Sequence, residues 1–304
     1  MGSEYSTAAH WPHEFSEPGL QKWAENLRRQ LAAPRVSLGL VFMSPRFFDR
    51  AQQVLEILRV HAHIPLLAGC SSQSLIVGDH EVEKDAGLTL GLYALPGADL
   101  RAVHFSQEQV EEANGPGYWH LETGVEPDRS NGWLTFINPF HLDSETWLRT
   151  WNEAYAPLPV LGGLASGESD AQATQVYLNG EVYPEGGVAI SVGGAVRVVG
   201  VTSQACTPIG QTWTLTKVEQ NIIHRIGNRP AYEVLAETFN QLPSDQQETA
   251  RGNLFIGLVV NEYLEDFQRG DQLRHLQLEA HRHGLRQRGD GLAKNNDFPV
   301  KTLQ

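Results

Sequence analysis

Cysteine is scarce in this sequence, and no stretch of it is suited to crossing a membrane. The 304 residues include two cysteines, Cys70 and Cys206, too few for the disulfide framework of a small secreted domain and typical of a reducing compartment. The first residues lack the basic segment and apolar run of a signal peptide. The longest apolar runs, such as residues 254–260, are far shorter than a bilayer requires. We therefore expect a soluble, cytoplasmic protein with no membrane partner.

Positive charge is also in short supply. Lys and Arg number 23 against 36 Asp and Glu, which gives a net charge of −13. A surface this acidic repels phosphate backbones, so we expect no nucleic-acid partner. The balance reverses in residues 272–304, where six Lys or Arg face three Asp or Glu, and this tail therefore differs in kind from the rest of the chain.

What the sequence does contain is an internal repeat. Residues 36–72 and 130–166 superimpose without a gap when one segment is shifted by 94 positions. The resemblance continues beyond them, so the two copies extend over about residues 36–105 and 130–201. A duplication of this kind indicates the architecture before any propensity is considered.

Each copy has the pattern of a strand, a helix and further strands. An apolar run of strand length, residues 38–43 or 133–137, is followed by a polar residue and a proline. The polar residues are Ser44 and Asn138, and a polar residue before proline is typical of a helix start. After the helix a second apolar run enters a Gly/Ser turn, and more strands follow. Each unit is β–α–β–β–β, which predicts a mixed α/β (α+β) fold with layered sheets covered by helices.

Periodicity and composition assign the remaining segments. Residues 17–31 carry apolar side chains at helical spacing and predict a helix. Residues 106–130 are polar and rich in Gly and Pro, and predict a linker between the copies. Residues 196–199 predict a strand that ends the second copy, and residues 273–283 predict a short basic helix.

Three segments carry a family resemblance. They are PLLAGCSSQSLI (residues 65–76), PVLGGLASG (159–167) and VTSQACTPIGQTWTLTKVEQNIIHRIGNRPAYEVL (201–235). These segments resemble FIST proteins, named from F-box and intracellular signal transduction, over about residues 34–270. The resemblance implies a sensory domain that binds small ligands, usually proposed to be amino acids. It implies no established catalytic residues.

The resemblance also divides the chain. Residues 1–33 form an N-terminal arm and helix, and residues 34–205 resemble an N-type FIST domain that holds both copies. Residues 206–271 resemble the start of a C-type FIST domain. Residues 272–304 depart from the family pattern as an atypical basic tail, where such a domain would continue with more strands.

Two Gly/Ser turns form the first candidate ligand site. In α/β sheets ligands bind at the carboxyl ends of strands, where backbone N–H groups are free. The gap-free alignment makes Gly69 the counterpart of Gly163. Tight turns alone would select the same residue types, so both interpretations stay open, and the duplication favours one shared cleft. The residues of the two turns are Gly69, Cys70, Ser71, Ser72, Gly162, Gly163, Ser166 and Gly167.

A third segment adds polar groups to this candidate site. It supplies Ser203, Gln204, Cys206 and Thr207. A few convergent polar groups are what orients a small ligand in a pocket, although a hydrogen-bonded hinge would use the same residues. We expect the three segments to line one cleft, with an amino acid or related metabolite as ligand and a signalling protein as partner.

Two other classes of function remain open, an enzyme and a protein-interaction scaffold. The enzyme would be a Cys- or Ser-dependent hydrolase or transferase. Cys70 or Cys206 could be its nucleophile, but a nucleophilic thiol needs a nearby base and a lowered pKa. No Walker A, Gly-x-Ser-x-Gly or His-Glu-x-x-His pattern occurs in the sequence. His61 and His63 have the spacing of a metal pair without the other ligands of a site. We expect a protein that is not an enzyme and uses neither metal nor cofactor.

Overall fold

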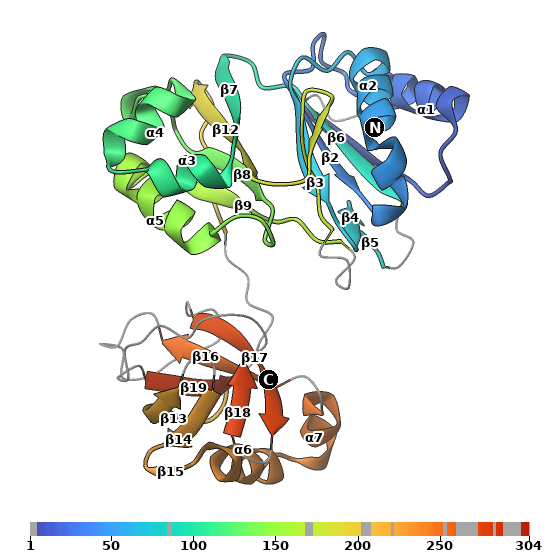
Figure 1. Cartoon of the computed structure of the whole chain (residues 1–304). Helices are drawn as coiled ribbons and strands as arrows, with labels where there is room; N and C mark the ends of the chain where they lie inside the picture. Colours follow the sequence, from blue (N-terminus) through green and yellow to red (C-terminus); the bar gives the residue numbers. More distant parts are fainter. Residues whose placement is uncertain are drawn as a thin grey trace. The chain divides into compact units, whose positions relative to one another are not determined.

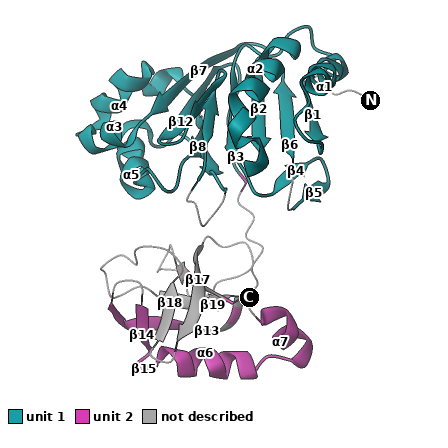
Figure 2. Ribbon diagram, turned by 45° about the vertical axis from the view of Figure 1, so that its right-hand side comes forward, with its two compact units in different colours: residues 1–200 teal, residues 201–304 magenta. Residues whose placement is uncertain are grey.

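The chain folds into two compact units, residues 1–200 and 201–304 (Figure 2). The structure is a computed structural model. It describes residues 5–83, 87–167, 173–201, 208–219, 222–251, 254–259, 273–281, 284–287 and 299–303. Sheets and helices are both abundant, so the mixed α/β class predicted from the sequence is confirmed.

The first half of unit 1 alternates strands and helices before it ends in antiparallel strands. Its sheet continues into two strands from the second half, in the order β1-β6-β2-β3-β10-β11, and β2 and β3 are parallel. Strands β4 and β5 form a separate hairpin. The elements are β1 (Ser6–Trp11), α1 (Glu17–Gln30), β2 (Leu38–Met43), the 3₁₀ helix η1 (Pro45–Arg50), α2 (Ala51–His61), β3 (Leu67–Ser71), β4 (Leu75–Val77), β5 (His80–Val82) and β6 (Leu88–Tyr93).

The second half of unit 1 repeats this order of elements. Its sheet has the order β7-β12-β8-β9, which matches β1-β6-β2-β3 position by position, and β8 and β9 are again parallel. The elements are β7 (Ala98–Phe105), α3 (Gln107–Glu112), α4 (Pro116–Thr123), the 3₁₀ helix η2 (Pro127–Arg129), β8 (Trp133–Ile137), α5 (Ser144–Tyr155), β9 (Val160–Leu164), β10 (Val176–Leu178), β11 (Glu181–Tyr183) and β12 (Gly187–Gly194).

Unit 1 has four layers, with the two sheets inside and helices on both outer faces (Figure 1). The alternation of side chains along a strand sends Leu38 into the core between the sheets and Val41 into the core under α1 and α2. In the second half, α5 covers the other sheet with Trp147 and Trp151, and Trp151 packs on Trp133 of β8. Burial on both faces of each sheet explains why β2 and β8 are almost continuously apolar.

Several segments differ from the expectations set by the sequence. Each repeated unit begins one strand and one helical region before the start expected from the sequence. Strand β1 corresponds to β7, and helix α1 corresponds to α3 and α4. The linker expected over residues 106–130 contains α3 and α4, since Ser106 caps α3 and Trp119 of α4 is fully buried. Residues 196–199 are not a strand. They follow the end of β12, and the side-chain amide of Asn131 binds the carbonyl of Val196 at 2.6 Å.

The start of the second repeated helix also differs from the expectation. Helix α5 begins at Ser144, and its N-cap is Asp143, whose carboxylate accepts a hydrogen bond from the Thr146 amide at 3.0 Å. The buried side chain of Asn138 instead organises the loop before the helix, where its Oδ1 accepts hydrogen bonds from two backbone amides. A polar residue before proline therefore marks a turn here and not a helix start.

Unit 2 is built around an antiparallel sheet with the order β13-β19-β16-β17-β18-β14-β15, and β13 also pairs with β14. Helix α6 packs on this sheet through Ala231 and Val234. The helix expected over residues 273–283 is strand β17 instead, consistent with apolar residues at every second position from Leu276. The elements are β13 (Pro208–Glu219), β14 (Ile222–Ile226), β15 (Arg229–Pro230), α6 (Ala231–Asn240), α7 (Ser244–Ala250), β16 (Phe255–Val259), β17 (Leu273–His281), β18 (Gly284–Gln287) and β19 (Pro299–Leu303).

Candidate functional site

The two Gly/Ser turns lie side by side at the carboxyl ends of β3 and β9. The Ser166 amide donates a hydrogen bond to the Ser71 carbonyl at 3.0 Å. The Gln73 amide donates to the Ser166 hydroxyl at 3.0 Å, and the Gln73 side chain binds the carbonyl of Gly167. The structure thus brings together the two segments that the sequence placed in one site, and joins them by direct hydrogen bonds. Binding of a ligand at this junction stays a prediction.

The serines of the junction already have protein partners. Ser71 is fully buried, and its hydroxyl accepts a hydrogen bond from the Gln175 amide at 3.0 Å. The Ser72 hydroxyl donates to the Ser74 carbonyl at 2.6 Å. These contacts leave the serines less free to bind a ligand than the sequence suggests. The hydrogen bonds of the junction connect the two sheets.

Close strand pairing explains two of the glycines. A Cβ atom on Gly69 would lie 1.7 Å from the Val41 carbonyl oxygen, and one on Gly162 would lie 1.8 Å from that of Thr135. Gly167 approaches the Ala173 carbonyl in the same way, at 2.0 Å. Gly163 is exposed, and a Cβ atom there would meet no atom within 4 Å. The turn interpretation thus accounts for three of the four glycines.

The register of the two halves corrects the gap-free alignment. Val41 lies opposite Gly69 in the β2–β3 pair, and Thr135 lies opposite Gly162 in the β8–β9 pair. The counterpart of Gly69 is therefore Gly162 and not Gly163. The cause is the connection from α5 to β9, which is one residue shorter than the connection from α2 to β3.

The remaining predicted residues differ in what the structure says of them. Ser203, Gln204, Cys206 and Thr207 lie outside the described residues. Cys70 lies in the core between the sheets with 5% of its surface exposed. Burial raises the pKa of its thiol to about 12, so the thiolate needed for nucleophilic attack is scarce at neutral pH. This weakens the enzyme alternative at Cys70.

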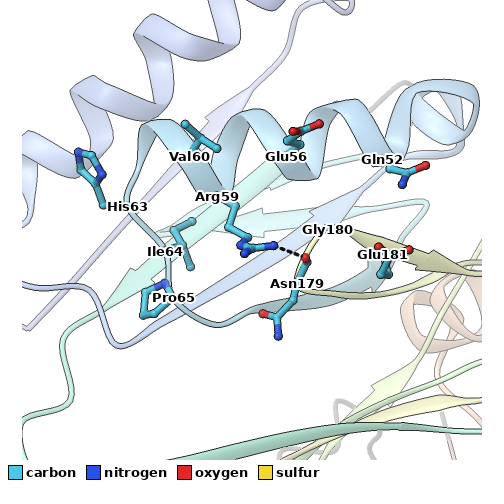
Figure 3. Close-up of a pocket in the computed structure, with 10 residues that line it drawn as sticks. All are labelled: Gln52, Glu56, Arg59, Val60, His63, Ile64, Pro65, Asn179, Gly180 and Glu181. Carbon is cyan, nitrogen blue, oxygen red and sulfur yellow. Dashed lines mark hydrogen bonds between the residues drawn. The ribbon is translucent and has the colours of Figure 1, made fainter.

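A groove that the sequence did not indicate lies at the opposite ends of the strands. It has a volume of about 630 Å³, within the range of small-ligand sites. Helix α2, the segment that leads into β3 and the turn between β10 and β11 form its walls (Figure 3). Its lining residues are Gln52, Glu56, Arg59, Val60, His63, Ile64, Pro65, Asn179, Gly180 and Glu181.

Hydrogen bonds fix the turn between β10 and β11 to α2 and to the start of β3. The Arg59 guanidinium donates a hydrogen bond to the Asn179 carbonyl at 2.5 Å (Figure 3). The Asn179 side-chain oxygen accepts a hydrogen bond from the Leu67 amide at 3.1 Å, and the Asn179 backbone N–H donates to the Leu67 carbonyl at 2.8 Å. Asn179 and Gly180 have φ angles of 50° and 96°, as expected of an Asn-Gly hairpin turn. Arg59 is therefore oriented before any ligand arrives.

The groove offers both signs of charge around an apolar surface. Arg59 supplies a cation, and Glu56 and Glu181 supply carboxylates. Pro65 contributes exposed apolar area, whereas the neighbouring Ile64 is buried in the core. Sequence reasoning missed this groove because its two parts lie more than a hundred positions apart, and the Asn-Gly turn was the one local signal available.

Over the described ranges, no three His, Cys, Asp or Glu side chains are grouped as a metal site would need. His61 instead contacts Glu25 at 3.1 Å. No helix among the described residues is long and apolar enough to cross a membrane.

Comparison with known proteins yields a family and several relatives. A sequence model of the FIST N domain matches residues 37–229. An uncharacterized protein of Mycobacterium bovis is 29% identical over 250 residues, which is 82% of this chain and 62% of that protein. One of Mycobacterium tuberculosis is 28% identical over 252 residues, 82% of this chain and 63% of its own length. One of Methanocaldococcus jannaschii is 23% identical over 230 residues, 73% and 44% respectively. The chain thus spans less than two thirds of these relatives.

Proposed function

The chain belongs to the FIST family, whose domains are associated with signal transduction, and on that premise we propose that it is a small-ligand-binding sensory module with an amino acid as ligand. The observation that carries the proposal is the groove, which places a pre-oriented guanidinium and two carboxylates around apolar surface. A zwitterion with an apolar side chain matches those three features.

Each part of an amino acid has a partner in the groove. Arg59 binds the α-carboxylate through the N–H groups that its bond to Asn179 leaves over, because a guanidinium carries five donors. Glu56 and Glu181 attract the ammonium group. Pro65 contacts the side chain. Pre-orientation of Arg59 lowers the entropy cost of binding.

Ligand binding here has a route to the rest of unit 1. The groove joins α2 of the first half to the β10–β11 turn, which comes from the second half. A bound amino acid would strengthen that connection and stabilise one arrangement of the two halves. A signalling protein that reads this arrangement, in the cytoplasm, completes the proposal. The strand-end junction of β3 and β9 remains the alternative location of the ligand.

A thermal-shift screen of the full chain with individual amino acids tests the proposal. A ligand present at a hundred times its Kd stabilises the folded state by about 2.7 kcal/mol, which is a measurable rise in Tm. Arg59→Met should weaken binding by about tenfold or more, since a hydrogen bond to a charged group contributes about 1.5–3 kcal/mol. Arg149→Met, at an exposed arginine of α5, is the matched control and should bind normally.

Two further outcomes locate the ligand. Glu181→Gln should weaken binding of the amino acid more than binding of the same acid without its amine. If Ser166→Ala abolishes the Tm shift while Arg59→Met leaves it intact, the ligand occupies the junction and not the groove. A folded sample that shows no shift with any amino acid contradicts the proposed function.

A further inference from the structure

Among the strands that the structure describes, β9 is at the open edge of its sheet, whereas the equivalent edge of β3 is covered. In the order β7-β12-β8-β9, strand β9 comes last, and among the described strands it pairs with β8 alone. Strand β3 has the same place in the other sheet, but β10 pairs with it antiparallel. Every residue of β3 is buried as a result, whereas Gly162, Gly163 and Leu164 of β9 are exposed.

The lengths of two connections explain this difference. Residues 165–175 connect β9 to the hairpin β10–β11. This connection is long enough for the hairpin to reach the opposite sheet, where β10 pairs with β3. Residues 72–74 separate β3 from its hairpin β4–β5, and that hairpin pairs with itself. By symmetry with the β10–β3 pair, β4 would cover β9, but β4 pairs with β5 instead.

Within the described residues, the outer edge of β9 has backbone groups without a hydrogen-bond partner, in a regular pattern. The Trp133 amide donates to the Pro159 carbonyl, and the Ala165 amide donates to the Ile137 carbonyl, both at 2.8 Å. Because alternate residues of a strand bond to opposite sides, Val160, Gly162 and Leu164 direct their N–H and C=O groups away from β8. The equivalent residues of β3 do bond to the neighbouring segment, as in the 2.8 Å bond from the Ser71 amide to the Gln175 carbonyl.

We propose that β9 pairs antiparallel with β9 of a second copy of this chain, with a two-fold axis at Gly162. The outward residues, at positions 160, 162 and 164, are symmetric about Gly162, so the edge is complementary to itself in register. Each copy then satisfies the donors and acceptors of the other, and the two sheets become one. Leu164, which is 57% exposed, lies opposite Val160 of the second copy and covers its apolar surface.

The charge of the chain favours this edge over the opposite edge of the same sheet for self-association. Residues 160–164 contain no charged side chain, in a protein whose net charge is −13. The opposite edge of the same sheet, β7, carries Asp99 and Arg101. Charged residues on an edge strand oppose pairing with another chain, and β9 lacks this protection. Because a short strand pair buries less than the ~1,200 Å² of a stable interface, the dimer should be reversible and concentration-dependent.

Sedimentation velocity of the full chain over a range of concentrations tests the proposal. The wild-type sedimentation coefficient should rise with concentration towards that of a dimer. Leu164→Lys places a charge on each side of the axis and should keep the chain monomeric. Leu121→Lys, at an α4 leucine that is 80% exposed, is the matched control and should associate like the wild type.

Hydrogen exchange measured by NMR identifies the contact itself. Protection of the Gly162 and Leu164 amides should increase with protein concentration, whereas the Gly163 amide, which belongs to the ladder with β8, should not change. A chain that stays monomeric at all concentrations overturns the proposal. So does a dimer that Leu164→Lys leaves intact, or one that forms without protecting these two amides. None of these outcomes depends on the ligand of the groove.

Discussion

Gly69 and Gly162 occupy the same position in two parallel strand pairs, each directly under a carbonyl oxygen of the neighbouring strand. The oxygens belong to Val41 and Thr135, and a Cβ atom would lie 1.7 Å and 1.8 Å from them. A backbone atom cannot move aside as a flexible side chain can. These two glycines therefore allow the central strands of both sheets to pair, whatever else the turns beyond them do.

We predict a large loss of stability at one of two adjacent glycines and a small change at the other. Gly162→Ala should lower the free energy of unfolding by about 3 kcal/mol or more, because the new methyl group clashes with backbone. Gly163→Ala should change it by less than about 1 kcal/mol, since nothing lies within 4 Å of its Cβ position. Urea denaturation of both variants checks this. A larger loss at Gly163 would show that the register derived for β9 is wrong.

The hydroxyl of Tyr155 connects three parts of the second half. It bonds the Thr123 hydroxyl at 2.6 Å and the carbonyls of Val125 and Trp119 at 3.1 and 3.2 Å, all buried. Tyr155→Phe should cost about 1–3 kcal/mol of stability, because it leaves buried polar groups without a partner. Tyr118→Phe is the control, since the Tyr118 hydroxyl bonds the exposed Glu112 at 3.3 Å. It should cost less than about 0.5 kcal/mol, as is usual for surface substitutions.

His104 should make the stability of unit 1 depend on pH. It stacks on Tyr183 with ring centroids 3.8 Å apart, and burial lowers its pKa, an effect that the nearby Glu185 partly opposes. The unfolded chain then binds the proton more tightly, so stability is retained at neutral pH and lost as pH falls below the ordinary histidine value of about 6.5. Unfolding titrations from neutral to mildly acidic pH should show a shallower loss for His104→Phe.

The exposed His80 provides the comparison for that experiment. It lies 3.4 Å from Asp79 with 80% of its side chain exposed, so His80→Gln should leave the acid-dependent loss of stability unchanged. If the wild type and His104→Phe lose stability equally as pH falls, His104 is not the cause of the pH dependence.

The Cys70 thiol should resist alkylation in the folded protein. Its pKa of about 12 leaves little thiolate at neutral pH, and its burial blocks access. In a Cys206→Ser background, iodoacetamide should label Cys70 more than about tenfold more slowly than in urea, where its pKa returns to about 8.5. Rapid labelling of the folded chain would reopen the nucleophile hypothesis.

The sequence predicts well those features that depend on local pattern. Residues 17–31 gave helix α1 within one residue, because its apolar face, its N-cap Ser16 and the proline of its first turn all agree. Both strand–helix–strand segments were also predicted, since apolar runs alternate with amphipathic helices there. The meeting of the two Gly/Ser turns followed from the duplication and the direction of parallel strands.

Other features depend on contacts between residues far apart in the sequence, which no local pattern indicates. Residues 106–130 look like a linker because their polar face is solvent-exposed, yet Trp119 donates a hydrogen bond to Thr150 of α5 at 3.0 Å and holds α4 in place. The one-residue offset between the halves was hidden because Gly162 and Gly163 are adjacent and identical in type. The groove was missed because Arg59 and Asn179 become neighbours only through the pairing of β10 with β3.

The pairing of β10 with β3 also determines how this protein could be divided. The halves of unit 1 look like separable modules along the chain, with a break between β6 and β7. A cut there would leave the first fragment with an uncovered β3 and the second with a hairpin that has no sheet. Each fragment would lack the strand that its exposed edge needs. A split version of this protein could therefore report when the two fragments associate.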